Sequence, residues 1–362
     1  MKNTLMKRAN ERLRRGWLWQ KWILTRQARF FGKHPLTSET AIVFLVPGYD
    51  VVGGGVMAIL AHAVESVRQR RTHGGDVYVC TMPGHPPLMR LTRFKNDHTI
   101  IDLRLILTGA KHLRRLHINI PEVHLDEFIG HGLPLLADAG VVMCSFNIML
   151  QNVDFSPSAA SIARLKAEGD VTITTAHKAY AKFGGDELLG CRAWQWSVWI
   201  SPEQYSRRNY EQKENIIIVS PDAHPERARV IATLKSALPE YQVIVIQNMR
   251  YGDYKKLIAR AKVSVTFGEG LDGYFVEPIF SGAIGCAVYN DRFFTDNYRS
   301  VPCVYESFEA LEAVLPGLVR TLDEGGFEAI WLRQFKVVAA DYSYGIYEDN
   351  MRKYYADNFT AK

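Results

Sequence analysis

The chain has 362 residues, of which 47% are hydrophobic and 23% are charged. These proportions are those of a globular protein, and they exclude a disordered tail, a collagen-like fibre and a disulfide-rich mini-protein. A chain of this length is expected to form two domains with substantial cores. Its five cysteines are scattered without C-x-x-C spacing, which indicates a reducing, cytoplasmic compartment and no zinc site.

The net charge of +6 comes from one end of the chain. Residues 1–34 hold ten basic residues and one acid, so they carry +9 and the remainder carries −3. A slightly acidic body is not expected to bind nucleic acid. The basic charge therefore belongs to one segment of the chain.

Residues 1–34 are predicted to form one or two amphipathic helices, in which Leu5, Ala9, Leu13 and Trp17 recur at every fourth position. Tryptophan on one face with Lys and Arg on the other is typical of a helix lying in a membrane interface. Each basic residue near an anionic leaflet contributes about 1 kcal/mol. We therefore expect this segment to dock on an anionic membrane surface. The alternatives are a helix packed on its own domain and, less favoured, nucleic-acid binding.

From residue 35 onward, apolar runs alternate with helical patterns. Strands are expected at 41–47, 76–82, 98–106, 116–120, 140–146 and 170–176, with helices at 56–69 and 158–169. This alternation is typical of parallel α/β layers. It predicts a Rossmann-like domain over residues 35–201.

A polar stretch over residues 202–214 is predicted to be a linker to a second α/β series over 215–335. The expected strands are 215–220, 241–247, 262–267 and 284–290, with helices at 227–238, 254–261 and 276–283 and helical patterns over 306–335. The tail, 336–362, is predicted to be a long amphipathic helix that crosses back to the first domain. The predicted fold class is thus α/β, with two Rossmann-like domains facing across a cleft and ligands at the carboxyl ends of the strands.

The stretch T-F-G-E-G-L-D-G-Y-F-V-E-P-I-F-S-G-A, at 266–283, is the richest motif and admits two interpretations. The first is dinucleotide binding through G-x-G-x-x-G, formed by Gly268, Gly270 and Gly273. Glu269 would then place a carboxylate beside a pyrophosphate, and Pro278 would interrupt the helix that the fingerprint requires. The motif also follows the third strand of its domain, so this interpretation is disfavoured.

The second interpretation rests on Glu269 and Glu277, which are separated by seven residues. This spacing resembles the E-x7-E motif of retaining GT-B glycosyltransferases, in which Gly270 and Gly282 also match the usual pattern. Pro278 stands where alanine is common, and proline is tolerated in the first turn of a helix. A helix N-terminus and glycine amides can cradle a diphosphate without steric hindrance.

The resemblance implies roles for several residues in donor binding. Glu277 would hold the nucleotide ribose, and Glu269 would face the donor sugar as a catalytic residue. The other implied donor-binding residues are Gly270, Leu271 and Asp272 through their amides, Arg227 in place of the family's lysine, and Gly54 and Gly55 in the loop after the first strand. The arginine usual in the family is absent, and Gly54 and Gly55 are also consistent with an ordinary tight turn.

In the first domain, T-T-A-H ends at His177, which matches the histidine that the family places beside the transferred sugar. A histidine on a surface loop is the alternative. Asn147, Gln151 and Asn152 follow an apolar strand and are candidates for acceptor binding, or for capping the next turn.

Q-N-V-D-F-S-P, T-T-A-H-K-A-Y and the E-x7-E stretch together resemble bacterial capsule and O-antigen glycosyltransferases. The resemblance implies a retaining hexosyltransferase that takes a nucleoside-diphosphate sugar, with a UDP-sugar as first choice, and a lipid-linked glycan acceptor. It implies a cytoplasmic enzyme, peripheral on the inner face of the bacterial inner membrane, without a cofactor or a metal; no D-x-D triplet is present. The alternatives are a GT-B sugar-nucleotide epimerase, an NAD-dependent oxidoreductase and an inactive membrane-associated scaffold.

Overall fold

The computed structural model describes residues 2–51, 53–92, 98–108, 112–139, 143–183, 187–198, 200–247 and 249–359, with side chains from residue 16 onward apart from 181–183. The chain divides into two compact units. The first comprises Met1–Thr174, Leu189–Trp194 and Met351–Lys362, and the second comprises Thr175–Leu188 and Gln195–Asn350. The predicted linker, 202–214, therefore lies inside the second unit, as does 175–201 apart from 189–194, which was expected in the first domain.

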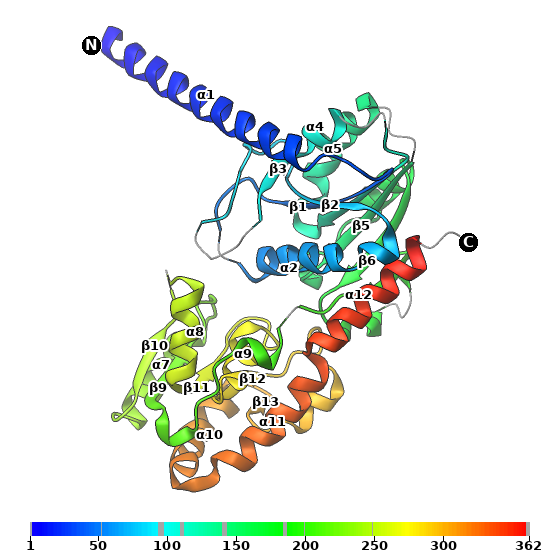
Figure 1. Cartoon of the computed structure of the whole chain (residues 1–362). Helices are drawn as coiled ribbons and strands as arrows, with labels where there is room; N and C mark the ends of the chain where they lie inside the picture. The colour runs from blue at the N-terminus through cyan, green and yellow to red at the C-terminus, as the bar shows by residue number, and fades with distance from the viewer. Residues whose placement is uncertain are drawn as a thin grey trace. The chain divides into compact units, whose positions relative to one another are not determined.

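The strands of the first unit lie in a sheet in the order β3-β2-β1-β4-β5-β6-β8-β7, whose edge strand β7 falls within residues 175–188 (Figure 1). Neighbouring strands from β3 to β5 are parallel. The strands are β1 (Thr40–Val46), β2 (Asp76–Thr81), β3 (Ile100–Asp102), β4 (Arg115–Pro121), β5 (Met143–Leu150), β6 (Asp170–Thr175), β7 (Glu187–Leu188) and β8 (Cys191–Gln195). Strand β1 is buried from Ala41 to Val46, as expected for a central strand of a parallel sheet covered on both faces.

Apart from α1, which precedes β1, the helices of the first unit lie between its strands, as in other α/β folds. They are α1 (Lys2–Lys33), α2 (Gly54–Arg68), α3 (Arg70–His73), α4 (Leu103–Thr108), α5 (Leu125–Ala139) and α6 (Ala159–Lys166). Residues 1–34 thus contain one continuous helix, and the side chains of Leu5, Ala9 and Leu13 lie outside the described part. No described helix is long and apolar enough to cross a membrane.

The second unit is built on a five-stranded parallel sheet in the order β10-β9-β11-β12-β13. Its strands are β9 (Glu214–Val219), β10 (Gln242–Val245), β11 (Ala261–Val265), β12 (Ile284–Val288) and β13 (Val304–Tyr305). Its helices are α7 (Arg227–Ala237), α8 (Tyr251–Arg260), α9 (Gly273–Phe280), α10 (Phe308–Thr321) and α11 (Phe327–Asp341). The apolar residues of β9, β11 and β12 form the core with α7 and α10.

Two predicted elements end earlier than expected. The strand expected at 98–106 stops at Asp102, because the Asp102 Oδ1 accepts a hydrogen bond of 2.9 Å from the Arg104 N–H and α4 begins at the intervening residue. The tail is not one helix, since α11 ends at Asp341 and α12 (Tyr344–Phe359) follows a break. The expected strand at 140–146 is β5 from Met143 onward, and its first three residues lie outside the described part.

Helix α12 belongs to both units, because Asn350 is the last residue of the second and Met351 begins the returning segment of the first. Within the first unit, Tyr354 is fully buried, and its hydroxyl lies 2.9 Å from His117 Nε2 on β4 and 3.1 Å from Thr172 Oγ1 on β6. The Tyr355 hydroxyl lies 2.5 Å from Ser66 Oγ on α2. The end of α12 is therefore an integral part of the first unit.

Candidate active site

The E-x7-E stretch forms the loop between β11 and α9, with Asp272 as the N-cap of the helix. The Asp272 Oδ1 accepts hydrogen bonds from the N–H groups of Tyr274 and Phe275, at 2.8 and 3.1 Å, and Oδ2 accepts one from the Thr266 hydroxyl at 2.6 Å. These bonds satisfy two of the helix's unpaired donors. Burial nevertheless raises the pKa of Asp272 to about 7. Its charge is therefore only partly present at neutral pH.

Gly270 is required by the shape of this loop. It has φ +86°, in the left-handed region, and an added Cβ would lie 2.6 Å from the Phe294 ring and 2.8 Å from the Val288 carbonyl oxygen. Glycine adopts this conformation without a steric cost. Glycine is therefore required here by the close packing of the loop against Phe294 and Val288.

His177 and Glu269 lie next to each other in the second unit. The His177 Nε2 is 3.5 Å from the Glu269 Oε2, and the histidine is only 5% exposed, whereas the Glu269 side chain is partly accessible. The rings of Tyr180 and Phe293 pack edge-on against the imidazole, each at 5.5 Å. No described residue bonds to the His177 Nδ1. The two predicted catalytic residues thus form a contact, although His177 was expected in the first domain.

Glu277 lies in α9 and is buried, with 8% of its surface exposed. The hydroxyl of Tyr251, at the start of α8, donates to the Glu277 Oε2 at 3.1 Å, and the Tyr205 hydroxyl lies 3.2 Å from that of Tyr251. Burial raises the pKa of Glu277 to about 7, while hydrogen bonds from the two tyrosines act in the opposite direction. A buried carboxylate that already accepts phenolic hydroxyls can accept the hydroxyl groups of a bound ribose as well.

The loop after β9 contributes Asp222, which sequence reasoning did not select. Its Oδ2 is buried, has no partner among the described residues, and would lie 2.9 Å from a Cβ at Gly268. Arg227, the proposed substitute for the family's lysine, donates from Nη1 to the carbonyl oxygens of Pro221 and Asp222 at 2.6 and 2.7 Å. Part of its guanidinium therefore braces the loop, and its Nη2 and Nε remain as candidate donors to an anion.

In the first unit, the glycine-rich loop after β1 lies against the end of β5. Gly53 is the N-cap of α2 without a side-chain capping bond, so Gly54 and Gly55 form the first turn. An added Cβ on Gly55 would lie 2.2 Å from the Gln151 Oε1, and the Gln151 Nε2 donates to the Gly55 carbonyl at 3.0 Å. The Asn152 side chain accepts from the Asp154 N–H at 2.8 Å and caps the next turn.

Asn147 was predicted to bind the acceptor, and the structure contradicts this prediction. It lies inside β5, is fully buried, and its Nδ2 donates to the Asn119 Oδ1 and the Thr174 Oγ1, both at 2.9 Å. Both amide hydrogens are used across neighbouring strands, so the side chain is part of the sheet's interior and cannot reach an acceptor. The polar residue followed an apolar run, which did not reveal that the strand continues to Leu150.

One group among the described side chains has the composition of a metal centre: His85, His124 and Glu127, whose potential ligand atoms all lie within 4.8 Å of one another. The Gly48 N–H donates to the His85 Nδ1 at 2.8 Å, so the proton of the neutral ring is on Nε2, 2.5 Å from the Glu127 Oε1. A protonated nitrogen cannot ligate a metal. The group instead holds the start of the glycine-rich loop against α5.

Neither the family models nor the curated proteins match the sequence. Solved structures do. A UDP-forming α,α-trehalose-phosphate synthase from Burkholderia xenovorans is 12% identical, with a TM-score of 0.51 over 90% of this chain and 100% of that one. The glucose-6-phosphate complex of a Burkholderia xenovorans synthase is 9% identical, with a TM-score of 0.52 over 87% and 99% of the two chains.

A putative UDP-N-acetylglucosamine 2-epimerase from Listeria monocytogenes is also similar. It is 9% identical, with a TM-score of 0.51 over 85% of this chain and 94% of that chain. At such low identity the likeness establishes the fold alone. The prediction of an α/β protein with two Rossmann-like parallel sheets is confirmed, and the architecture matches GT-B structures.

Proposed function

We propose that the protein is a retaining glycosyltransferase that moves a hexose from a nucleoside-diphosphate sugar, with UDP as the first choice of nucleotide, to a polysaccharide acceptor. The observation that carries the proposal is the contact between His177 and Glu269. Glu269 lies in the loop that precedes α9, and the buried Glu277 lies within α9. This arrangement supplies a partly accessible carboxylate for sugar hydroxyls and a buried one for the ribose. The GT-B fold is consistent with it.

The donor diphosphate would lie at the start of α9 and near Arg227. The N–H groups of Tyr274 and Phe275 are already bonded to Asp272, so the proposed donors to the diphosphate are the loop amides of Gly270, Leu271 and Asp272. The raised pKa of Asp272, about 7, reduces the repulsion that its carboxylate would otherwise exert on the diphosphate. In this proposal, the lower charge of Asp272 offsets in part the absence of the arginine that is usual in the resembled family.

In the proposed reaction, the bond between the sugar C1 and the diphosphate oxygen breaks, and a bond from C1 to the acceptor oxygen forms on the same face. The acceptor's hydroxyl proton passes to the departing diphosphate. Glu269 and His177 would hold the sugar's hydroxyls while charge develops on the ring. For the first unit, Gly54 and Gly55 are proposed as donor-binding residues and Gln151 as an acceptor-binding residue.

The acceptor is proposed to be a lipid-linked glycan of capsule or O-antigen synthesis, used at the inner face of the bacterial inner membrane. The support is the charge of the chain, since residues 1–34 carry ten basic residues against one acid. Basic, tryptophan-containing helices bind anionic lipid surfaces. An enzyme held there would meet acceptors that remain in the bilayer.

The test is a thermal-shift panel with UDP, GDP, dTDP, CMP, ADP and NAD. A ligand at about 100 times its Kd stabilises the folded state by roughly 2.7 kcal/mol, which a melting curve resolves. We expect one nucleoside diphosphate to stabilise the wild type and Glu277→Ala to abolish the shift, while Glu240→Gln, on an exposed site of the same unit, leaves it intact. Stabilisation by NAD alone would instead identify an oxidoreductase.

Transfer itself is tested with the donor that the panel identifies. Glu269→Ala and His177→Ala are each expected to lower the rate of sugar transfer by at least about ten-fold while leaving nucleotide binding in place. If both variants transfer sugar at the wild-type rate, the proposed site is wrong. A wild type that interconverts the free nucleotide-sugar without any acceptor would point to an epimerase.

A further inference from the structure

The described part of α1 presents tryptophans to solvent. Trp17, Trp19 and Trp22 are 59%, 60% and 44% exposed, and the rings of Trp19 and Trp22 stack with their centroids 5.1 Å apart. Leu18, between them, is also exposed. Isolated exposed apolar residues are common, but a group of large aromatics on one short stretch marks an interaction surface.

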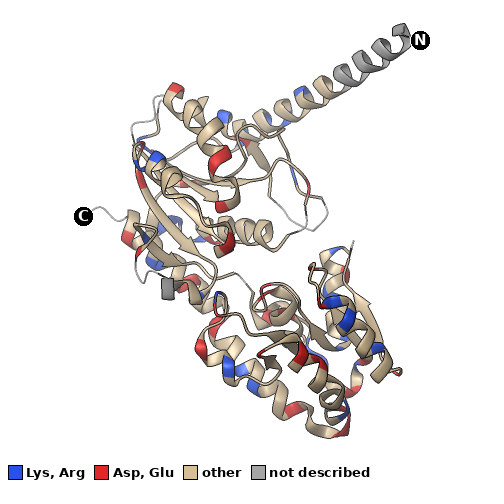
Figure 2. Ribbon diagram, turned by 180° about the vertical axis from the view of Figure 1, so that it is seen from behind, with Lys and Arg blue, Asp and Glu red and all other residues tan. Residues whose placement is uncertain are grey.

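Cations accompany these rings. The Lys21 Nζ lies 5.2 Å from the Trp17 ring and the Arg26 guanidinium lies 4.5 Å from the Trp22 ring, each one helical turn further along. Lys and Arg recur along the described part of α1 (Figure 2). A second copy of this helix would bring two strongly positive surfaces together, which disfavours self-association. An anionic bilayer accommodates both the aromatic rings and the charge.

The far half of α1 is fixed to the first unit. Gln27 is fully buried; its Nε2 donates to the Leu88 carbonyl at 3.1 Å, and its Oε1 accepts from the Asp102 N–H at 3.0 Å, where β3 ends. Ile23, one turn earlier, is 3% exposed. An amide bonded at both ends in a buried site allows one orientation of the helix and resists any other.

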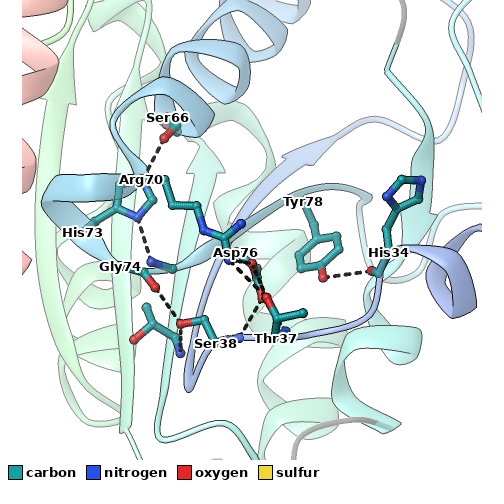
Figure 3. A network of polar contacts seen from close by, with 11 residues as sticks. His34, Thr37, Ser38, Ser66, Arg70, His73, Gly74, Asp76 and Tyr78 are labelled. Atoms are coloured by element: carbon teal, nitrogen blue, oxygen red, sulfur yellow. Dashed lines mark hydrogen bonds and ion pairs between the residues drawn. The ribbon is translucent and has the colours of Figure 1, made fainter.

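The chain that follows α1 is held equally firmly (Figure 3). The Asp76 Oδ2, at the start of β2, accepts hydrogen bonds from the N–H groups of Thr37 and Ser38 at 2.6 and 2.9 Å, and its Oδ1 pairs with the Arg70 Nη2 at 2.5 Å. The Tyr78 hydroxyl donates to the His34 carbonyl at 3.1 Å. No free linker therefore separates the helix from the sheet.

We infer that α1 is a rigid strut whose side bearing the stacked Trp19 and Trp22 inserts into an anionic bilayer surface, so that docking sets the orientation of the first unit and does not merely tether it. The inference extends the membrane association included in the proposed function. It rests on the described residues of α1 and not on donor chemistry. It can therefore fail or succeed independently of the transferase activity.

The docking face is tested by flotation of the full chain with vesicles of phosphatidylglycerol and phosphatidylethanolamine. The variant W19A/W22A is expected to lower the partition coefficient of the protein at least about ten-fold. Replacing the anionic vesicles with vesicles of phosphatidylcholine alone is expected to lower it by a similar factor. The matched control is V64A/V67A, which removes exposed apolar side chains of α2 and is expected to float like the wild type. Flotation of W19A/W22A at the wild-type level, or a wild type that does not float, would overturn the docking face.

Rigidity is tested by electron–electron distance measurements between spin labels at Gln20→Cys on α1 and Val67→Cys on α2, with the half-buried Cys144 changed to Ser. The distance distribution is expected to be narrow, in solution and on vesicles, and to broaden in Gln27→Leu, which keeps the packing volume and loses both bonds. Thr25→Val, on the exposed side of α1, is the control and should keep the narrow distribution. A broad distribution in the otherwise unaltered chain would show that α1 is a flexible tether.

Discussion

Replacing Glu277 with Gln should stabilise the protein above neutral pH while weakening nucleotide binding. Glu277 is buried, and its pKa is raised from 4.5 to about 7, chiefly by burial. A carboxyl whose pKa is higher in the folded state than in the unfolded state costs stability when ionised. The cost appears as pH rises above about 4.5 and is complete above about 7.

The magnitude follows from the shift. Each pKa unit corresponds to 1.36 kcal/mol, so ionising Glu277 costs on the order of 3 kcal/mol of unfolding free energy at pH 8. Glutamine keeps an oxygen that accepts the Tyr251 hydroxyl, now 3.1 Å from Oε2, and carries no charge. We expect Glu277→Gln to raise the free energy of unfolding by about 2–3 kcal/mol at pH 8 and to leave it within about 1 kcal/mol of wild type at pH 4.

The functional half of the prediction has the opposite sign. Losing a charged acceptor for ribose hydroxyls should weaken UDP binding about ten- to hundred-fold. Urea titrations at pH 4 and pH 8, followed by tryptophan fluorescence, measure the first effect, and calorimetric titration with UDP measures the second. Glu240→Gln, on the surface of the same unit, should change neither. An equal stability change at both pH values would refute the reasoning, because the gain would then not arise from the buried charge.

Three further predictions concern glycine geometry, a buried lysine and a buried amide. Gly270→Ala should lower the free energy of unfolding by about 1–3 kcal/mol, measured by urea titration, because φ at this residue is +86°. The control Gly252→Ala, which has open space around it in α8, should leave the free energy of unfolding unchanged or raise it. The Lys213 Nζ donates to three backbone carbonyls, and burial lowers the pKa of this lysine to about 7, so the free energy of unfolding should rise as pH increases from about 7 towards 10.5. Lys213→Met should remove that rise, and an unchanged pH dependence in this variant would contradict the prediction. Asn147→Leu should destabilise the first unit by about 2–4 kcal/mol because the buried side chains of Asn119 and Thr174 lose their hydrogen-bond partner. A stability within about 0.5 kcal/mol of wild type would show that these hydrogen bonds do not stabilise the sheet.

The fold class was predictable because the strands of both units are continuous apolar runs. The pattern of β1 and β9 is carried by neighbouring residues, so a short window of sequence contains the whole signal. The end of β3 was not predictable in this way. Its last residue, Asp102, is both a strand residue and the cap of α4, and it is the hydrogen bonds with Arg104 and with Gln27 that decide between the two states.

The residues of the candidate site, like the strands, were predictable only where the signal is local in the sequence. Glu269 and Glu277 were identified because their spacing is local and belongs to one loop and one helix. Tyr251 and Asp222 were missed, since each follows a different strand and reaches the site only when β10, β9 and β11 are neighbours in one sheet. Asn147 was misassigned for the converse reason: a polar residue at the apparent end of an apolar run lies within β5, bonded across the sheet.

The passage of α12 between the two units has a consequence for synthesis on the ribosome. The hydrogen-bond partners of Tyr354 and Tyr355 in the first unit are His117, Thr172 and Ser66, which all belong to the first 174 residues. The two tyrosines can bind there only after the ribosome has translated the chain beyond Met351. At about 5–20 residues per second, that delay lasts roughly 10–35 seconds. The unit that is translated first is therefore the last to be completed, and during that interval the buried polar groups of His117, Thr172 and Ser66 lack the tyrosine hydroxyls that they bond in the folded chain.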